Sequence, residues 1–473
     1  MPFEALGEDV LLKLLCFCDV STALAVSAIN KPLRRIALSK QLWLSSVLDT
    51  RFREELELPP PSRENLECLS TEELIAVVKN AVVGPGPLCD SKHDESSSVI
   101  TTSVQIPLDD VGTNRPSGAR LLPGARYLLL HTGSPSTTQH TWYLYHVWST
   151  RRVWHRLMQP HTVCEVDLMP GSAIARVFFV QTVDYFNTYT LHVEEVDLIT
   201  GASHESFNFS LDSTVFGEKP WSIMGDFLLG PVQHSHRLLA LINWRAFTFV
   251  FLDGYDLEKA RLIPGYILST HHVRFPLPAR GSFLAATPLQ AFSAHWLPLT
   301  DDGAGLVAQL EARSAFTIMI HNLNIATMQE RLEYNGQAIS SNLMSVAHAA
   351  LHAGVYDISI YGSQIWEPPP PPRRVTLMER IGNRILSMVG TARRPGAEVR
   401  PVLVPAHCEA VLRYKLTPAV SAGGEGGYLR LVSARCVSSR AQAHCPRAII
   451  SLSRRNPMTV VYRERKRTGA DAA

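Results

Sequence analysis

The sequence predicts an α+β multidomain protein in which a small N-terminal module of three short helices precedes a large all-β domain. In the first 50 residues, apolar side chains recur at three- and four-residue steps, as on one face of a helix. From about residue 98 the apolar period becomes two, which is typical of strands. A chain of 473 residues that is 46% hydrophobic and 19% charged can fill the cores of two or three folding units.

Polar breaks divide the first 50 residues into helices. The first helix carries its apolar residues on one face: Leu6, Val10, Leu11, Leu14, Leu15 and Cys18. Ser21 is placed to cap a second helix, and Pro32 suits the first position of a third. The apolar positions that follow are Leu24, Ile29, Leu33, Leu42 and Trp43. Each helix is marginal alone, so we expect them to pack together or against a partner.

The stretch from Leu6 to Leu24 resembles the opening of the F-box, which runs Leu-Pro-x-Glu/Asp-hydrophobic-x-x-x-Ile/Leu-Leu-x-x-Leu-Asp, then a small polar pair and Leu. The Leu42-Trp43 pair matches the end of that family pattern. Gly7 stands where Pro is usual, and Leu33 stands where many members carry Trp. The resemblance covers about residues 3–50 and is closest to fungal-type members, whose F-box precedes a β-rich region. The alternative is that these are the first helices of a larger α/β domain.

The resemblance implies a non-catalytic subunit of a cullin-type (SCF) ubiquitin ligase. Its helices would bind a Skp-type adaptor and its β-rich domain would select a target protein, without a cofactor. It further implies that the following residues contact the adaptor or form the small core of the module: Leu6, Val10, Leu11, Leu14, Leu15, Leu24, Ile29, Leu33, Leu42 and Trp43. A scaffold that binds the adaptor without ubiquitin transfer is one alternative, and a ligand-binding or enzymatic propeller is another.

Strand pairs recur in the second part of the chain at a spacing that fits a degenerate β-propeller. Pairs begin near residues 126, 176 and 226, about the length of one propeller blade. The segment from Glu195 to Gly201 resembles the Trp-Asp-x-x-Thr-Gly ending of a blade, with the Trp replaced. A β-sandwich or an irregular β-domain is the alternative. Each of these readings excludes a doubly wound nucleotide-binding fold.

Composition places the boundaries between these parts. We expect an F-box over residues 1–50, a helical linker over 51–90, the β-rich domain over 91–450, and a basic tail over 451–473 with a flexible end. The proline run from Pro368 to Pro372 is expected to be a stiff spacer in a loop.

The motifs of common catalytic and metal sites are absent from the sequence. There is no phosphate-binding loop, no Gly-x-Ser-x-Gly and no His-Glu-x-x-His. His348 and His352 have the spacing of two metal ligands on a helix, but they lack the intervening Glu and a third ligand. We therefore expect no metal. Five tryptophans are expected in the core rather than on a binding surface: Trp142, Trp148, Trp154, Trp244 and Trp296.

Charge and cysteine usage bear on the compartment. The formal net charge is +2 with charges spread along the chain, so we expect neither a nucleic-acid partner nor a membrane partner. The eight cysteines contain no C-x-x-C pair, and the first residues lack an apolar signal core. We expect reduced thiols and a cytoplasmic or nuclear location.

Overall fold

Short helices occupy the N-terminal part of the chain. They are α1 (Glu8–Leu15), α2 (Val20–Ser27), α3 (Lys31–Ala37), α4 (Lys40–Leu48), α5 (Thr50–Glu55), α6 (Arg63–Glu67) and α7 (Thr71–Val83). Asp19 caps α2, since its carboxylate accepts from the backbone N–H of Thr22 at 2.7 Å. The expected cap Ser21 instead lies inside that helix, which begins one residue after Asp19. Pro32 lies in the first turn of α3, as predicted.

The computed structural model describes most of the chain in segments separated by gaps. The described residues are 6–83, 98–108, 111, 116–133, 140–160, 162–168, 172–183, 188–212, 221–231, 238–253, 259–273, 281–300, 317–319, 327–349, 352, 354–364, 409–419, 427–437, 447–451 and 458–465. The expected spacer at Pro368–Pro372 lies outside them, as does His234 to His236.

Two apolar cores hold the helices together, and α4 contributes to both. In the first core, Leu42 packs with the buried faces of α1 and α3. In the second, Trp43 and Val47 pack with residues of α5 and α7, including Phe52 and Leu74. Because neighbouring residues of one short helix serve both cores, the chain continues across residue 50 as one packed helical module (residues 6–83) rather than as a domain followed by a free linker.

Strands make up the rest of the described chain and form six sheets. The first sheet contains β2 (Pro116–Leu121), β3 (Tyr127–Thr132), β4 (His140–His146) and β5 (Arg151–Met158). The second contains β6 (Val163–Leu168), β7 (Ile174–Val183), β8 (Thr188–Asp197) and β9 (Ser203–Asp212). The third contains β10 (Ser222–Met224), β11 (Phe227–Pro231), β12 (Leu238–Asn243) and β13 (Thr248–Asp253), and β17 (Leu297–Pro298) and β18 (Thr317–Met319) add to it.

The remaining three sheets use the later strands and the first one. The fourth sheet contains β14 (Ala260–Ile263), β15 (Tyr266–Val273), β16 (Gly281–Pro288) and β19 (Met328–Arg331). The fifth contains β20 (Glu333–Tyr334), β21 (Gln337–His348), β22 (Tyr356–Gln364), β23 (Glu409–Thr417) and β24 (Tyr428–Val437). The sixth contains β1 (Ser98–Ile106), β26 (Met458–Arg465) and β25 (Ala448–Ser451). Short 3-10 helices follow β4 and β16, at Val147–Ser149 and Leu289–Phe292.

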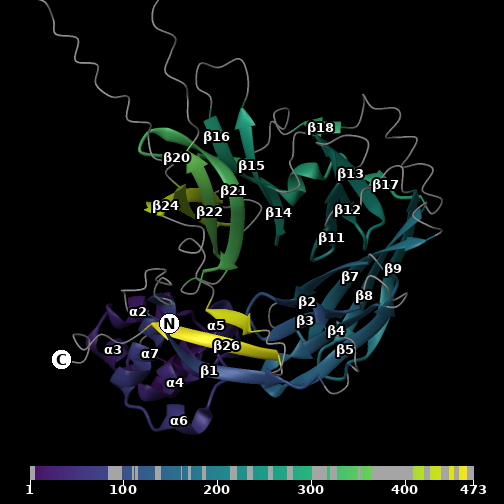
Figure 1. Cartoon of the computed structure of the whole chain (residues 1–473). Coiled ribbons are helices and arrows are strands. Elements are labelled where there is room, and N and C mark those ends of the chain that lie inside the picture. Colours follow the sequence, from purple (N-terminus) through teal and green to yellow (C-terminus); the bar gives the residue numbers. More distant parts are fainter. Residues whose placement is uncertain are drawn as a thin grey trace, which may run out of the picture.

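The six sheets follow one another around a ring, so the all-β region has a six-bladed, propeller-like arrangement (Figure 1). The first strands of neighbouring sheets lie side by side, as β6 does with β10 and β10 with β14. Five apolar clusters fill the spaces between successive sheets, from the β1–β26–β25 sheet round to the β20–β24 sheet. The strands β3, β7 and β11, each the second in its sheet, begin at Tyr127, Ile174 and Phe227, close to the predicted positions.

One turn shows why the predicted blade ending was recognisable. At the end of β8 the carboxylate of Asp197 accepts from the backbone N–H groups of Ile199 and Thr200, both at 2.8 Å. Gly201 follows with φ +79°, a left-handed conformation that glycine adopts without strain. The hydrogen bonds to its carboxylate lower the pKa of Asp197. The Asp and the Gly thus reverse the chain into β9, while the replaced Trp is not needed for the turn.

The end of the chain corrects the predicted boundaries. Met458–Arg465 form β26, which pairs with β1 on one side and β25 on the other, so this part of the expected tail is a central strand. The strands therefore continue to Arg465, beyond the expected end of the β-rich domain at residue 450. Thr459, Val461 and similar β-forming residues explain the strand, and the basic run that suggested a tail begins only at Arg463.

Candidate functional site

Helix α1 leaves a line of apolar side chains open to solvent. Leu6, Val10, Leu14 and Phe17 are exposed, and Phe17 is 84% exposed. Val10 and Leu14 lie one turn apart on α1, Leu6 precedes that helix and Phe17 follows it. Leu11 and Leu15, about 100° further round the helix, are buried in the module. The sequence of α1 is thus apolar on two sides, and the module covers only one of them.

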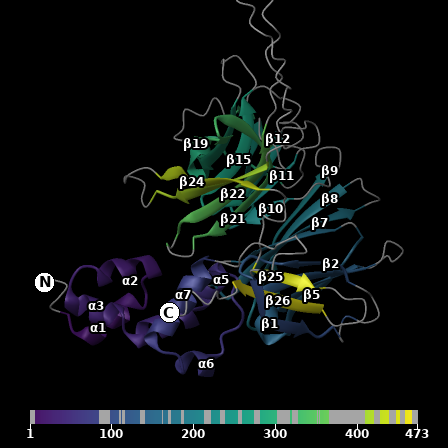
Figure 2. The same ribbon diagram turned by 60° about the vertical axis from the view of Figure 1, so that its left-hand side comes forward.

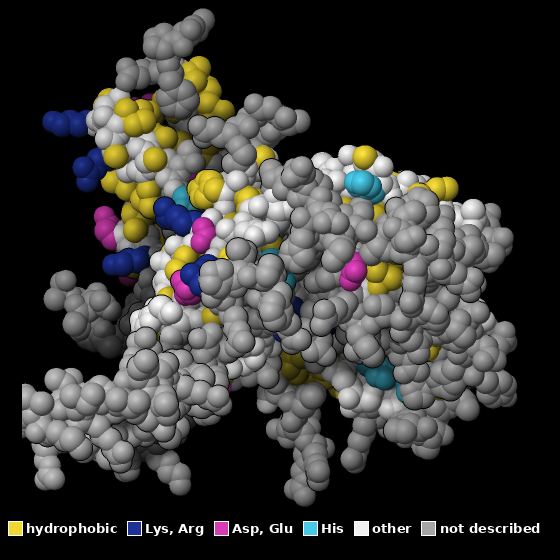
Figure 3. Space-filling view, turned by 90° about the horizontal axis from the view of Figure 1, so that it is seen from above, with side chains coloured by type: hydrophobic (Ala, Val, Ile, Leu, Met, Phe, Trp, Pro, Cys, Tyr) yellow, Lys and Arg dark blue, Asp and Glu magenta, His cyan; other side chains and the backbone are white. Residues whose placement is uncertain are grey.

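Helix α2 and the turn after it extend this surface. Leu24 is exposed, and Ile29, which precedes the Asn30 cap of α3, is 65% exposed. We call Leu6, Val10, Leu14, Phe17, Leu24 and Ile29 together the apolar face. In Figure 3, hydrophobic side chains gather on the helices that project from the body at the upper left. Six of the fifteen large hydrophobic side chains that are exposed in the described residues belong to the apolar face, which is the pattern of a docking site.

The structure separates the ten predicted contact residues into two groups of five. Leu6, Val10, Leu14, Leu24 and Ile29 lie on the apolar face. Leu11, Leu15, Leu33, Leu42 and Trp43 are buried in the two helical cores. The indole N–H of Trp43 donates to the carbonyl of Ala37 at 3.0 Å, which fixes α4 against α3. The buried group supports the surface, and the exposed group presents it.

Phe17 is the residue that sequence reasoning missed. It follows the last turn of α1, and the predicted apolar face of the first helix passes over it to Cys18. The signal was present, because Phe17 continues the steps from Leu6, Val10 and Leu14 by a further three residues.

The surroundings of the apolar face contain charges and thiols but no reactive group with an activating neighbour. The Glu8 carboxylate and the Arg35 guanidinium form an ion pair that ties α1 to α3. Burial, and next the charge of Asp19, raise the pKa of the Cys18 thiol, so this thiol stays protonated at neutral pH. Within the described residues no group of three or more His, Cys, Asp or Glu side chains is placed to hold a metal ion.

The helical module is attached to the propeller-like body by polar contacts at its α5 and α7 end. Arg126, in the turn before β3, pairs with Glu54 of α5 at 2.6 Å. The backbone N–H of Arg447, next to β25, donates to the Glu57 carboxylate at 3.3 Å, and its guanidinium donates to the carbonyl of Ala81 in α7. Figures 1 and 2 both show the helices beside β26 and β1, outside the ring. We call these contacts the joint.

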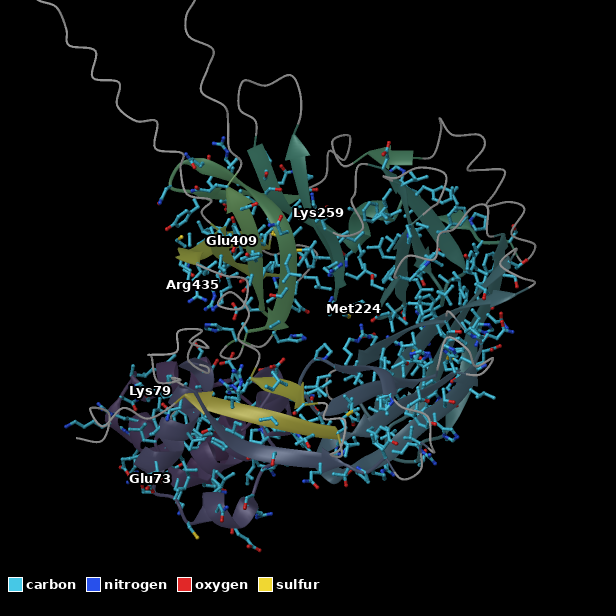
Figure 4. All side chains as sticks on the ribbon, viewed as in Figure 1. Glu73, Lys79, Met224, Lys259, Glu409 and Arg435 are labelled. Carbon is cyan, nitrogen blue, oxygen red and sulfur yellow. The ribbon has the colours of Figure 1, made fainter. Side chains whose placement is uncertain are left out.

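A buried arginine stiffens the helical side of the joint. Arg53 donates to the carbonyls of Val47 at 2.8 Å and Pro59 at 3.0 Å. Burial lowers its pKa to about 10, so it remains charged at neutral pH. The guanidinium thereby links α4 to the segment that follows α5. Figure 4 marks α7 of the same module by Glu73 and Lys79.

The histidine pair does not have metal-site geometry. His348 ends strand β21 and packs against the ring of Tyr356 at 5.0 Å, and burial lowers its pKa. The one-turn spacing to His352 requires a helix, but His348 ends a strand and the backbone N–H of His352 donates to the carbonyl of Ala349. His271 likewise stacks on Phe283, with ring centroids 5.8 Å apart.

None of the five predicted core tryptophans is exposed, as expected. Trp154 and Trp244 are buried between blades, and Trp142, Trp148 and Trp296 are half-buried. The indole N–H of Trp154 donates to the Glu194 carboxylate at 3.2 Å. These side chains hold the blades together rather than form an aromatic contact surface.

Helices joined to a six-bladed, propeller-like body define the structural class, and comparisons with known proteins add little to it. No family model matches the chain, and no curated protein matches it. Among solved structures it is similar to an uncharacterized protein from Listeria monocytogenes at 12% identity and a TM-score of 0.23, covering 51% of this chain and 78% of that one. It is also similar to the WD40 domain of SCAP from fission yeast at 8% identity and a TM-score of 0.25, covering 73% and 81%. Neither TM-score is high enough to carry an argument.

No helix among the described residues is both long and apolar enough to cross a membrane.

Proposed function

We propose that this chain is an F-box-type substrate receptor of a cullin-type ubiquitin ligase. The apolar face of α1 and α2 binds a Skp-type adaptor, and the propeller-like body binds the target protein. The chain supplies binding and position and takes no part in bond making. Target ubiquitylation then follows from holding a target lysine close to the ubiquitin carrier, an effect of effective concentration.

The observation that carries the proposal is the exposed apolar face. Leaving six large apolar side chains in contact with water is unfavourable, by a free energy of about 25 cal/mol for each Å² that a partner would bury. We infer that these side chains bind a partner, because monomeric proteins rarely expose contiguous apolar patches of this kind. The face also coincides with the residues that resemble the F-box, which is an independent reason to expect an adaptor there.

The joint supports the second half of the proposal. Ubiquitin transfer to a bound target requires a limited range of distances between adaptor and target sites. Arg126 and Arg447 attach the helical module to the ring by an ion pair and by a bond to a backbone carbonyl, and Arg53 bonds within the module to the carbonyls of Val47 and Pro59. A flexible tether at this point would lower the effective concentration of the target lysine.

Charged substitutions on the apolar face test adaptor binding. Val10→Asp and Phe17→Asp each place a carboxylate where the adaptor would bury an apolar side chain. We expect each to weaken binding of a purified Skp-type adaptor by about thirtyfold or more, the loss of one interface hot spot. Isothermal titration calorimetry with the full chain measures the change.

The matched control is Leu157→Asp, since Leu157 is 57% exposed on β5 of the body, far in sequence from the helices. It should bind the adaptor as the unsubstituted chain does. Equal binding by Phe17→Asp and Leu157→Asp, or no binding by the unsubstituted chain, would refute the proposal. Circular dichroism excludes unfolding, which is expected for Leu11→Asp in the core and not for the two exposed sites.

A further inference from the structure

The β20–β24 sheet turns one face to its neighbour and leaves the other without a covering sheet among the described residues. Ala410, Leu412, Tyr414 and Leu416 of β23 point into the apolar cluster shared with the β14–β19 sheet. The odd-numbered residues of β23 therefore point to the opposite face. On that face the buried apolar side chains are limited to Tyr361, Val411 and Val437.

Positive charges meet on this second face. Lys415 of β23 lies directly opposite Arg430 of β24, and Arg413 lies two residues further along β23 on the same face. Arg413 and Arg430 are exposed, and Lys415 is half-buried. We call these three the cation triangle. Figure 4 locates this end of the molecule by Glu409 on β23 and Arg435 on β24.

Like charges directly opposite each other in an antiparallel pair destabilise a sheet. The carboxylate in the same row is Asp357 of β22, which lies opposite Lys415 on its other side and interacts electrostatically with Lys415 and Arg413. One carboxylate beside three cations leaves the group with a net charge of +2. No residue of the triangle forms an ion pair among the described residues that would offset the repulsion.

The spacing of the triangle indicates what would fit it. Residues two apart on one strand lie about 7 Å apart, and directly opposite residues lie about 5 Å apart. Carboxylates at alternate positions of an extended segment have the same repeat of about 7 Å. An extended segment can lie along the sheet face at the end of the strands where Asp357 and Arg430 are exposed. Tyr361 and Val411, further along that face, are buried, so the segment would be held mainly by the charged side chains.

We propose that this face of β22, β23 and β24 binds an acidic protein segment that carries Asp or Glu at alternate positions. Charge complementarity selects this occupant. A nucleic acid fits less well, because it requires a larger positive field than a chain of formal net charge +2 provides. The proposal does not rest on the adaptor, because the face belongs to the propeller-like body.

The probe is a fluorescein-labelled peptide with Glu at three alternate positions in a Ser/Thr background, and its control has Gln at the same positions. Fluorescence anisotropy with the full chain measures binding at low ionic strength. We expect the Glu peptide to bind at least about tenfold more tightly than the Gln peptide, and its affinity to fall as salt rises. Arg413→Gln combined with Arg430→Gln should remove that difference.

The matched control is Arg261→Gln, an exposed arginine on β14 of another sheet, which should leave the affinity for the Glu peptide unchanged. Equal loss in both variants, or equal binding of Glu and Gln peptides, overturns the proposal. So does tighter binding of a phosphoserine peptide or of a single-stranded oligonucleotide at the same triangle.

Thermal stability gives a second, binding-independent readout. Because Arg430 opposes Lys415, Arg430→Gln should raise the Tm of the free chain by about 1 °C or more, a gain that Arg261→Gln should not reproduce. A lower Tm for Arg430→Gln would show that other groups in the sheet already offset the repulsion between Arg430 and Lys415. That result would contradict the proposal.

Discussion

Adjacent leucines in α1 have opposite roles, because consecutive side chains on a helix point about 100° apart. Leu11 and Leu15 are buried and hold the helical module together. Leu14 lies between them in sequence and is exposed on the apolar face. The sequence predicts that all three are apolar helix positions. It does not predict which of them faces a partner, because that depends on where α3 packs.

A single carboxyl group in the helical module should make stability depend on pH. Burial, and next the charge of Asp49, raise the pKa of Glu55 to about 7 in the folded chain from an ordinary value of 4.5. The folded state therefore holds this proton more tightly than the unfolded state. The stabilisation is fully present below pH 4.5 and is lost as the pH rises through about 7.

Glu55→Gln tests this effect. We expect the fall in Tm of the helical module between pH 5 and pH 8 to be smaller in the variant than in the unsubstituted chain, since Gln does not ionise. Differential scanning calorimetry at several pH values measures it. Parallel pH profiles for the two proteins would show that Glu55 ionises normally.

At the scale of elements, the blades are joined by charges as well as by apolar clusters. Arg176 of β7 is almost fully buried, and its guanidinium nitrogens lie 3.4 Å from Glu195, 3.4 Å from Asp226 and 3.7 Å from Asp167. Asp226 belongs to the next blade, so Arg176 bridges two sheets. Burial raises the pKa of Asp167, and the nearby Arg176 opposes that rise.

Arg176→Ala should therefore be strongly destabilising. Its removal leaves the buried carboxylate of Asp167 without its cation, while Glu195 and Asp226 keep Arg245. An unpaired buried charge costs about 3 kcal/mol of unfolding free energy. Urea denaturation followed by tryptophan fluorescence measures the loss. Arg63→Ala serves as the control, because Arg63 pairs with Glu67 on the exposed surface of α6 and should leave stability unchanged. A similar result for both variants would mean that Arg176 does not couple the blades.

The early blades could be predicted from the sequence and the later ones could not, for a physical reason. Each of the first three four-stranded blades is built by consecutive strands joined by short connections, so a regular spacing near 50 residues is visible. After β13 the connections lengthen: residues 365–408 separate β22 from β23, which are paired neighbours. The pairing of β1 with β26 joins residues more than 350 positions apart. No local pattern can reveal such a contact.

At the scale of the whole molecule, the structure places the apolar face at one end and a ring of sheets at the other, with the joint between them. The pairing of β1 with β26 brings the first and last strands of the ring together next to the helices. Arg447 and Arg126 attach the ring to the helical module. This arrangement suits a chain that holds one protein at a set distance from another.

Hydrogen–deuterium exchange of the full chain, with and without a purified Skp-type adaptor, tests the proposed function most directly. We expect the adaptor to slow amide exchange in α1, α2 and the start of α3, where the apolar face lies, and to leave exchange in the sheets unchanged. Slower exchange confined to the sheets, or no change at adaptor concentrations that saturate known F-box proteins, would contradict the proposal.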